Sequence, residues 1–444
     1  MRTPISPSFV KPWLPKSSVP KYLFTNVNII ELVIGTCVPK CSIYLKDGRI
    51  AAISTNGQKI SFISPDTQEI DLNGKYICPG LIDCHVHISA VPGEIDVRQV
   101  MATPETLALL RMTYVCRDML CRGFTTVRDC GGAPYALKQA CEEWLIVGPR
   151  LFISGHGLSQ TGGHGDFRSA YDRSDCACGV TSGLSRVCDG VSACLATARD
   201  ELRRGADFVK IMGGGGVVSP TDRLENNQFS PEEIRAFVLA AKNNHTYVTC
   251  HAYTPESIRI AIENGVRGIE HGNLIDRDTA REMARRGCYL TPTLVTYQTL
   301  ADPALPGFLP PENVDKNEKV LSMGLEALRI AKEEGVSMCY GSDLLGPLGT
   351  YQSREFGIRS AILTPLDILQ SATITPAKML SQETLGQVKV GFEADILILN
   401  NNPLEDITIF ERHETEVLAV IKGGRVCSSR IPGLDGLLDK LRDL

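Results

Sequence analysis

The chain has 444 residues, more than a single hydrophobic core usually organises, so one large domain with an appendage, or two domains, is expected. Its 46 Lys and Arg against 51 Asp and Glu give a formal charge of −5, which argues against nucleic acid as a partner. No apolar run reaches the roughly 18 residues of a membrane helix, and no signal peptide pattern opens the chain, so no membrane association is predicted.

Both ends of the chain carry strand patterns. Residues 1–20 contain five prolines and are expected to form a loose arm. Residues 21–79 and 386–444 contain alternating or apolar runs of strand length, separated by turn signals such as the Asp-Gly at 47–48. These two segments are expected to build one small β-sandwich domain.

The stretch from 80 to 385 alternates short apolar runs with amphipathic helical patterns. In SPEEIRAFVLAAKNN, Ser230 caps a helix, Pro231 fits its first turn and Glu233 completes a capping box, and the apolar run TYVTCH follows. Eight apolar runs of this kind predict parallel βαβ units, and hence an α/β fold of the (β/α)8 barrel type. An open doubly wound sheet is the alternative.

Sixteen cysteines are present, and many of them lie inside these apolar patterns, where a free thiol behaves as a small hydrophobic group. Without a signal peptide, this usage favours a reducing compartment over a disulfide-linked fold. A cytoplasmic location is therefore expected.

Histidines gather at the ends of the predicted strands. His85 and His87 lie two residues apart in LIDCHVH, so both leave the same face of the strand. His251 and His271 end two later strands. Because the catalytic residues of a barrel come from the carboxyl ends of its strands, four histidines at one mouth predict a metal site rather than packing accidents. Imidazole and carboxylate ligands suit zinc and its neighbours.

The order of motifs resembles that of the metal-dependent amidohydrolase superfamily, and within it the branch of imidazolonepropionase-like and Xaa-Pro dipeptidases that includes the ochratoxin-hydrolysing amidase of fungi. The resemblance covers nearly the whole chain and rests on segments such as PGLIDCHVH, LSQTGGHGD, GADFVKIMGGGGVVSP, YGSD and GFEADILIL. It implies the barrel with its small β-sandwich and two divalent metal ions, with Zn²⁺ expected. By the same resemblance His85 and His87 hold one metal, and His251 and His271 hold the other.

The resemblance also implies that Lys210 is carboxylated and bridges the metals, and that Asp343 is both a ligand and a proton shuttle. An ordinary lysine has a pKa of about 10.4 and would be repelled by metal ions as a cation. Its neutral amine can add carbon dioxide, and the resulting carbamate is an anion whose two oxygens can bridge a metal pair. The simpler alternative is a strand-end lysine that pairs with a carboxylate or a substrate phosphate.

These features predict a binuclear metal-dependent amidohydrolase, in which metal-activated hydroxide cleaves the amide bond of an N-acyl amino acid, a dipeptide or an ochratoxin-like amide. His164, in GGHGD, is assigned to substrate binding. So is Tyr253, which stands where relatives of this branch commonly carry a second histidine. A deaminase, lactonase or lyase acting on a cyclic metabolite is the alternative enzyme, and a metal-free scaffold is the alternative without activity. A homo-oligomer is expected.

Overall fold

The computed structural model describes residues 10–15, 18–169, 171 and 180–439, so part of the expected N-terminal arm lies outside the described residues. Within the arm, Trp13 Nε1 donates a hydrogen bond of 3.0 Å to Glu143, the residue that ends helix α4 (Tyr135–Glu142). This contact holds the described part of the arm against the body of the protein.

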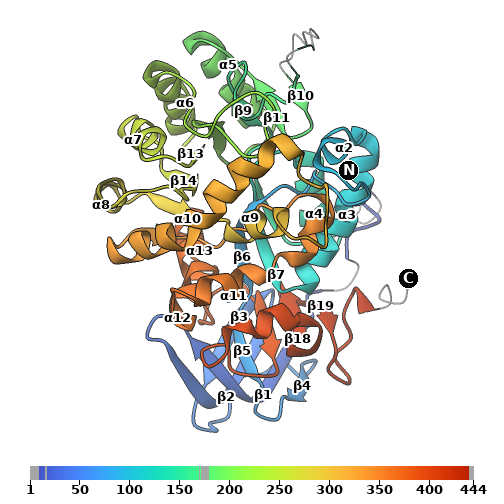
Figure 1. Cartoon of the computed structure of the whole chain (residues 1–444). Helices are drawn as coiled ribbons and strands as arrows, with labels where there is room; N and C mark the ends of the chain where they lie inside the picture. Colours follow the sequence, from blue (N-terminus) through green and yellow to red (C-terminus); the bar gives the residue numbers. More distant parts are fainter. Residues whose placement is uncertain (1–9, 16–17, 170, 172–179, 440–444) are drawn as a thin grey trace.

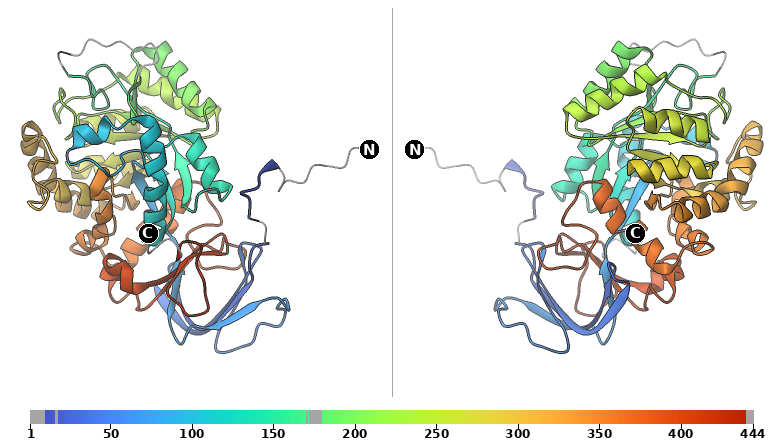
Figure 2. Two further views of the ribbon diagram at one scale, coloured as in Figure 1. Left: turned by 90° about the vertical axis from the view of Figure 1, so that its right-hand side faces the viewer. Right: turned by 90° about the vertical axis from the view of Figure 1, so that its left-hand side faces the viewer.

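Strands from both ends of the chain form one sheet at one end of the molecule (Figure 2). Its order is β19-β18-β17-β5-β1-β2-β3, with β4 paired to β1. The N-terminal strands are β1 (Tyr22–Glu31), β2 (Thr36–Lys46), β3 (Arg49–Ser54), β4 (Gln68–Asp71) and β5 (Tyr76–Pro79), and the C-terminal strands are β17 (Ile396–Leu399), β18 (Val417–Lys422) and β19 (Arg425–Ser429). The antiparallel pairing of β17 with β5 joins the two ends of the chain.

The expected β-sandwich takes the form of this single sheet. The reason lies in β1, which pairs with β2 along one edge and with both β4 and β5 along the other. Hydrogen-bonded strand pairing therefore continues from the N-terminal strands to the C-terminal strands within one sheet.

Parallel strands alternate with helices through the middle of the chain (Figure 1). The strands are β6 (Leu81–Val86), β7 (Phe124–Asp129), β8 (Arg150–Ile153), β12 (Val209–Met212), β13 (Val248–Ala252), β14 (Gly268–His271), β15 (Tyr289–Thr291) and β16 (Ser337–Met338). The helices between them include α3 (Glu105–Cys121), α4, α5 (Val191–Arg203), α6 (Pro231–Asn243), α7 (Pro255–Glu263), α8 (Arg277–Arg286) and α10 (Val314–Glu333). This arrangement confirms an α/β fold with parallel sheets.

The parallel strands are divided between two sheets. β6, β7 and β8 form one, and β12 to β16 pair in chain order within the other. An insertion after β8 adds β9 (Gly157–Ser159), β10 (Val180–Ser182) and β11 (Ser185–Val187) to the second sheet, which the sequence pattern did not predict. Hydrogen bonds link the margins of the two sheets: at one margin Asp207 N–H donates to Ile153 O at 2.7 Å, and at the other Cys84 N–H donates to Tyr340 O at 2.8 Å.

Shorter helices complete the fold. They are α2 (Val97–Met101), α9 (Leu294–Leu300), α11 (Arg354–Ser360), α12 (Pro365–Ser371), α13 (Ile374–Met379) and α14 (His413–Glu416), with short 3₁₀ helices at η1 (Pro311–Asn313), η2 (Gly346–Tyr351) and η3 (Ile407–Arg412). Within the described ranges, none of the helices combines the length and the apolar character needed to cross a bilayer.

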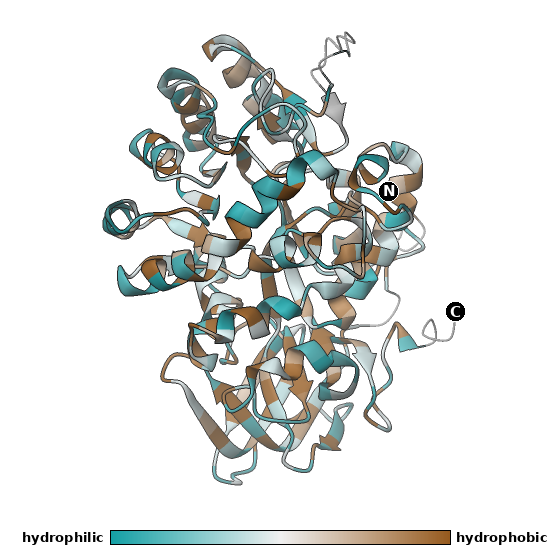
Figure 3. Cartoon of the chain, viewed as in Figure 1, coloured by the Kyte–Doolittle hydropathy of each residue, from teal (hydrophilic) through white to brown (hydrophobic). Residues whose placement is uncertain are grey.

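One apolar cluster connects the terminal sheet to the parallel strands. Hydropathy colouring shows apolar residues concentrated along the strands, while the helices carry polar residues on part of their surface (Figure 3). Leu397 and Leu399 of β17 belong to the same buried cluster as Leu81 of β6 and Phe124 of β7. The C-terminal strands therefore help to form the core beneath the first parallel strands.

We expect Leu397→Ala to destabilise the whole molecule, because it removes buried methyl groups from this shared cluster. Deletions of this kind cost about 2–5 kcal/mol of unfolding free energy, measurable by urea denaturation. Val390→Ala, at a side chain that is 53% exposed near the same sheet, is the control and should cost less than about 0.5 kcal/mol. Equal urea midpoints for the two variants would contradict the shared core.

Candidate metal and catalytic centre

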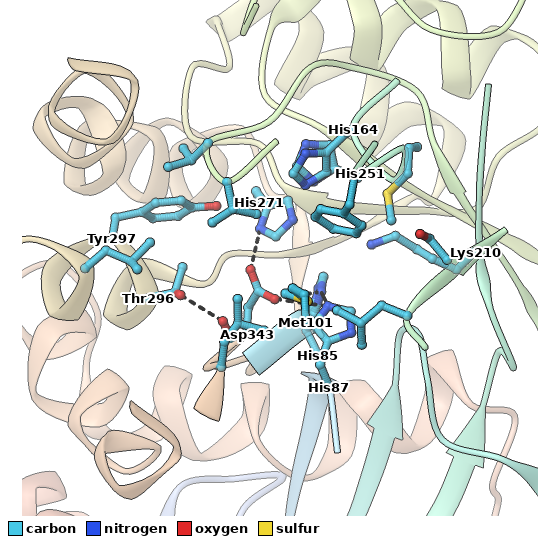
Figure 4. Close-up of a pocket in the computed structure, with 18 of the residues that line it drawn as sticks. His85, His87, Met101, His164, Lys210, His251, His271, Thr296, Tyr297 and Asp343 are labelled. Carbon is cyan, nitrogen blue, oxygen red and sulfur yellow. Dashed lines mark hydrogen bonds and ion pairs between the residues drawn. The ribbon is translucent and has the colours of Figure 1, made fainter. Parts of the chain in front are cut away.

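All eight residues predicted for the site line one cavity at the carboxyl ends of the parallel strands (Figure 4). They are His85, His87, His164, Lys210, His251, Tyr253, His271 and Asp343. Residues separated by more than 250 positions in the chain meet here because parallel strands end at the same edge of their sheets.

The imidazoles of His85 and His87 and the carboxylate of Asp343 face one another. The two Nε2 atoms are 3.3 Å apart, and Asp343 Oδ1 lies 3.3 Å from the first and 3.2 Å from the second. The Nδ1 atoms are held elsewhere, by Glu270 Oε2 at 2.8 Å and by the carbonyl oxygen of Gly131 at 2.9 Å. When each neutral ring donates its Nδ1–H to these acceptors, both Nε2 lone pairs point at the same place.

The pKa shifts of His85 and Asp343 both favour the charged forms of these side chains. Burial opposes protonation of His85, but the charges of Cys130 and Asp343 outweigh it and raise the pKa of His85 well above its usual value. Burial likewise opposes ionisation of Asp343, but His85 and His87 outweigh it and hold the pKa of Asp343 well below its usual range. The cluster therefore favours an ionised carboxylate with a cation beside it.

His251 and His271 form the second pair, with ring centroids 4.6 Å apart. His251 Nε2 donates to the carbonyl oxygen of Gly215 at 3.1 Å, which leaves its Nδ1 lone pair free. His271 Nδ1 lies 2.8 Å from Thr293 Oγ1. Burial lowers the pKa of both rings well below the usual value, so both are neutral imidazoles, the form that binds metals.

Lys210 reaches the cavity between these two pairs (Figure 4). Its side chain is buried, with 1% of its surface exposed. Throughout the described part of the chain, no side chain or carbonyl makes a hydrogen bond or ion pair with Lys210 Nζ. Burial of a polar amine without a hydrogen bond is unfavourable, so a ligand at this position would stabilise the site.

The residues present fit divalent transition metals. Imidazole nitrogens and a carboxylate are the ligand types preferred by zinc and its neighbours. One group suited to an ion consists of His85, His87 and Asp343, whose ligand atoms lie within 4.8 Å of one another. A cation between the two Nε2 atoms and the carboxylate would take the place of the proton that the raised pKa of His85 favours there.

His164 approaches the centre from the loop after β9. Its ring stacks on His251 with centroids 4.2 Å apart, and its Nδ1 lies 2.9 Å from Ser219 Oγ. A side chain at Gly216 would collide with this ring, since a Cβ there would lie 1.9 Å from Nδ1. Ser219 Oγ in turn donates to Asp222, so a buried chain of hydrogen bonds fixes the orientation of His164. Burial lowers the pKa of His164 to about 4.

Tyr253 contacts a second tyrosine that sequence reasoning missed. The hydroxyls of Tyr253 and Tyr297 are 2.9 Å apart, and both side chains are buried in the cavity wall. Tyr297 belongs to α9, whose sequence LVTYQTL reads as an ordinary amphipathic segment. Its role could not be recognised without the contact.

Sequence reasoning also missed the buried ion pair of Arg128 and Glu270. Arg128 Nη2 lies 2.6 Å from Glu270 Oε1, and neither side chain is exposed. Glu270 uses its other oxygen to accept from His85 Nδ1. Both residues stand in buried strands, in FTTVRD and in GIEH, and a charged side chain in a strand of this kind was the available signal.

Comparison with known proteins identifies the family of the chain. Residues 76–427 match the model of the Amidohydrolase family. The chain belongs to the amidohydrolase family. This amidohydrolase is 30% identical over 402 residues to ochratoxinase of Aspergillus niger, a match that spans 85% of this chain and 83% of that protein.

Solved structures agree with this placement. The crystal structure of one amidohydrolase is 43% identical, with a TM-score of 0.88, and covers 93% of this chain and 100% of its own. A prolidase complexed with N-methylphosphonate-L-proline is 41% identical, with a TM-score of 0.88, and covers 92% of this chain and 100% of its own. The predicted enzyme class, a hydrolase of amide or peptide bonds, is confirmed.

We expect Glu270→Gln to weaken both the fold and the metal site. The substitution leaves the Arg128 guanidinium buried without a counter-ion and removes the anionic acceptor of His85 Nδ1–H. Breaking a buried pair costs about 3–5 kcal/mol of unfolding free energy, and loss of such a support typically weakens metal binding about 10- to 100-fold. Denaturation and metal titration measure the two effects.

The loss of stability should also depend on pH. Contacts with Arg128 and His85 outweigh burial and hold the pKa of Glu270 well below its usual value. The stabilisation is therefore complete above the unfolded pKa of about 4.3 and is lost as the pH falls through the lower folded pKa. Glu326→Gln, at an exposed pair with Arg329, is the control and should change little. A Glu270→Gln deficit that stays constant from neutral to strongly acid pH would contradict the assignment.

Proposed function

We propose that this amidohydrolase cleaves the amide bond of a small molecule with the help of two divalent metal ions, with Zn²⁺ as the expected metal. The observation that carries the proposal is the convergence of four histidines, three of them buried, with Asp343 and the unpartnered Lys210 in one cavity. A fold that had lost its metals would not need to keep six such groups together in one cavity, so an enzyme is favoured over a scaffold.

The ligands divide naturally into two sets. His85 and His87 would hold one metal and His251 and His271 the other, with Asp343 as a further ligand. Lys210 would bridge the metals as a carbamate, formed when its neutral amine adds carbon dioxide and releases a proton. This modification would turn a buried cation into an anion and so supply the partner that the lysine otherwise lacks.

When bound, the metals would polarise the amide carbonyl and increase the acidity of the attacking water. Asp343, ionised and directed into the cavity, accepts a proton from that water and delivers it to the leaving nitrogen as the C–N bond breaks. The Tyr253 hydroxyl, positioned by Tyr297, donates a hydrogen bond to the carbonyl oxygen as negative charge develops there. His164, which also lines the cavity, contacts the substrate.

The substrate class follows from the relatives. One is named ochratoxinase, and another is a prolidase crystallised with a phosphonate derivative of proline. A phosphonate is tetrahedral, like the intermediate of amide hydrolysis. An N-acyl amino acid or a dipeptide, in which an amide stands beside a carboxylate, is therefore the proposed substrate of this chain, and ochratoxin-like amides belong to the same class.

We also infer that the eight parallel strands close into a barrel and that the terminal sheet forms a separate domain around residues 21–79 and 386–444. The hydrogen bonds at both margins of the two parallel sheets support closure. A homo-oligomer located in the cytoplasm remains our expectation for the assembled protein.

Screening the zinc-loaded enzyme against a panel of N-acyl amino acids and dipeptides tests the function directly. Mass spectrometry should detect release of the free amino acid from at least one member. If every amide and dipeptide survives while a lactone or an aminated ring is converted, the amide assignment is wrong.

We expect Lys210→Ala protein to bind less metal and to lose activity, because the bridging anion is gone. Elemental analysis should fall below two equivalents of metal under conditions that saturate the wild type. A short carboxylic acid added with the metal should restore part of the rate. Full metal content together with a full rate would refute the carbamate.

We expect Asp343→Asn to separate metal binding from proton transfer. The four histidines and Lys210 remain, so metal content should largely survive, whereas kcat should fall about 10²- to 10⁴-fold with little change in KM. Metal content and kcat are measured on the same preparation. Loss of both in step, reversed by excess metal, would assign Asp343 to metal binding alone.

A further inference from the structure

A second, larger cavity adjoins the catalytic one. The catalytic cavity has a volume of about 60 Å³, whereas the neighbouring cavity has a volume of about 630 Å³. Pockets that enclose small-molecule ligands usually have about 300–1,000 Å³. The catalytic cavity therefore has room for little more than the reacting amide, and the remainder of a substrate must lie outside it.

Part of the wall between the two cavities is shared. Met101, at the end of α2, and Leu184, in the turn between β10 and β11, line both. Figure 4 labels Met101 among the residues around the catalytic cavity. Methionine is unbranched and adapts its shape readily, so this wall can yield to a substrate group.

The second cavity lies directly behind the first pair of histidines. Gly132, which lines it, follows the residue whose carbonyl accepts the hydrogen bond from His87 Nδ1. Ser89, two residues after His87, lines it as well. A substituent that enters this cavity can therefore belong to the same molecule as an amide held at the catalytic centre.

The interior of the second cavity is largely apolar. Its walls include Val100, Met101, Ala108, Met112, Ala133 and Ile153. Among its polar members, His156 Nδ1 is held by Glu201 at 3.0 Å, and Glu105 and Arg204 are exposed. Ser89 Oγ is buried and has no hydrogen-bond partner among the described residues.

We propose that this cavity, which shares Met101 and Leu184 with the catalytic cavity, is a subsite for a long apolar substituent of the substrate amide. The inference rests on the proposed amide hydrolysis. It identifies the preferred substrates as amides with an extended aliphatic or aromatic group, either on the acyl side or on the amine side. The gain comes from removing that group from water, at about 0.8 kcal/mol for each buried methylene, or about three- to fourfold in kcat/KM.

Two substrate series distinguish the acyl side from the amine side. The first lengthens the acyl group of an N-acylglycine from acetyl to octanoyl, and the second enlarges the amino acid of an N-acetyl derivative from alanine to phenylalanine. With the zinc-loaded enzyme, kcat/KM should rise about three- to fourfold per methylene in one series until the cavity is full. A flat profile in both series would overturn the inference.

Filling the cavity should abolish this preference. Ala108→Phe places a ring inside it from α3, and Ala136→Phe places one at the rim from α4, where Ala136 is exposed and a larger side chain displaces no packed neighbour. Both variants should reduce the ratio of kcat/KM for the longest and shortest substrates at least tenfold. Leu110→Phe, on the same helix as Ala108 but outside the cavity, is the control and should retain the ratio of the wild type.

A binding measurement keeps this test separate from the proposed function. Calorimetry with octanoate, which cannot be hydrolysed, should show binding to the wild type and to Leu110→Phe, and weaker binding to Ala136→Phe. This pattern supports the subsite even if no amide in the panel is cleaved, in which case the proposed function alone fails. If octanoate binding falls in the variants while the substrate preference is unchanged, the cavity is a separate ligand site and the subsite is refuted.

Discussion

The buried ion pair between Arg128 and Glu270 is the interaction on which the catalytic centre depends. It joins β7 to β14, and Arg128 also donates to the carbonyl oxygen of Cys84 on β6, so three strands from both parallel sheets are tied together. A buried ion pair is favoured when further hydrogen bonds satisfy its members. Glu270 accepts from His85 and Thr249 as well as from Arg128, whereas Arg128 Nη1 has no hydrogen-bond partner among the described residues. The same carboxylate thus holds the sheets and sets the proton position on a predicted metal ligand.

Backbone strain marks the same region. His271 and Asp343 have φ values of 73° and 53°, in the left-handed region that residues other than glycine seldom occupy. The surroundings hold Asp343 in place, since its N–H donates to His85 O at 2.8 Å and its carbonyl accepts from Thr296 Oγ1 at 2.8 Å. Strain of this kind is typical of functional sites, where the required side-chain direction outweighs the cost of an unfavourable backbone conformation. Here it occurs at the last residue of β14 and in the segment that follows β16, and both side chains line the catalytic cavity.

The two cavities are lined by different parts of the fold. The candidate metal ligands stand at strand ends, which neighbouring strands hold on both sides. The walls of the larger cavity come mainly from segments outside the strands, including α2, α3, the start of α4 and the turn between β10 and β11, although Ile153 of β8 also lines it. Such connecting segments can change in sequence without disturbing the parallel strands. A family with one chemistry and several substrates is expected to vary there.

The sequence by itself determined the strand and helix order and the candidate ligands, because those properties are local. The period of two in LIDCHVH places His85 and His87 on one face whatever surrounds them, and the capping box at Ser230 starts α6 as predicted. Strand-end positions of His251 and His271 follow from the same local patterns.

Only the tertiary structure decided which residues support the candidate ligands. Arg128 and Glu270 are 142 positions apart, and Tyr253 and Tyr297 are 44 apart, so no local period relates them. The pairing of β9 with β12 and the joining of β17 to β5 likewise depend on hydrogen bonds between distant segments. Such partners are selected by the packing of the whole chain, because a buried charge or hydroxyl must find its complement wherever the fold provides one.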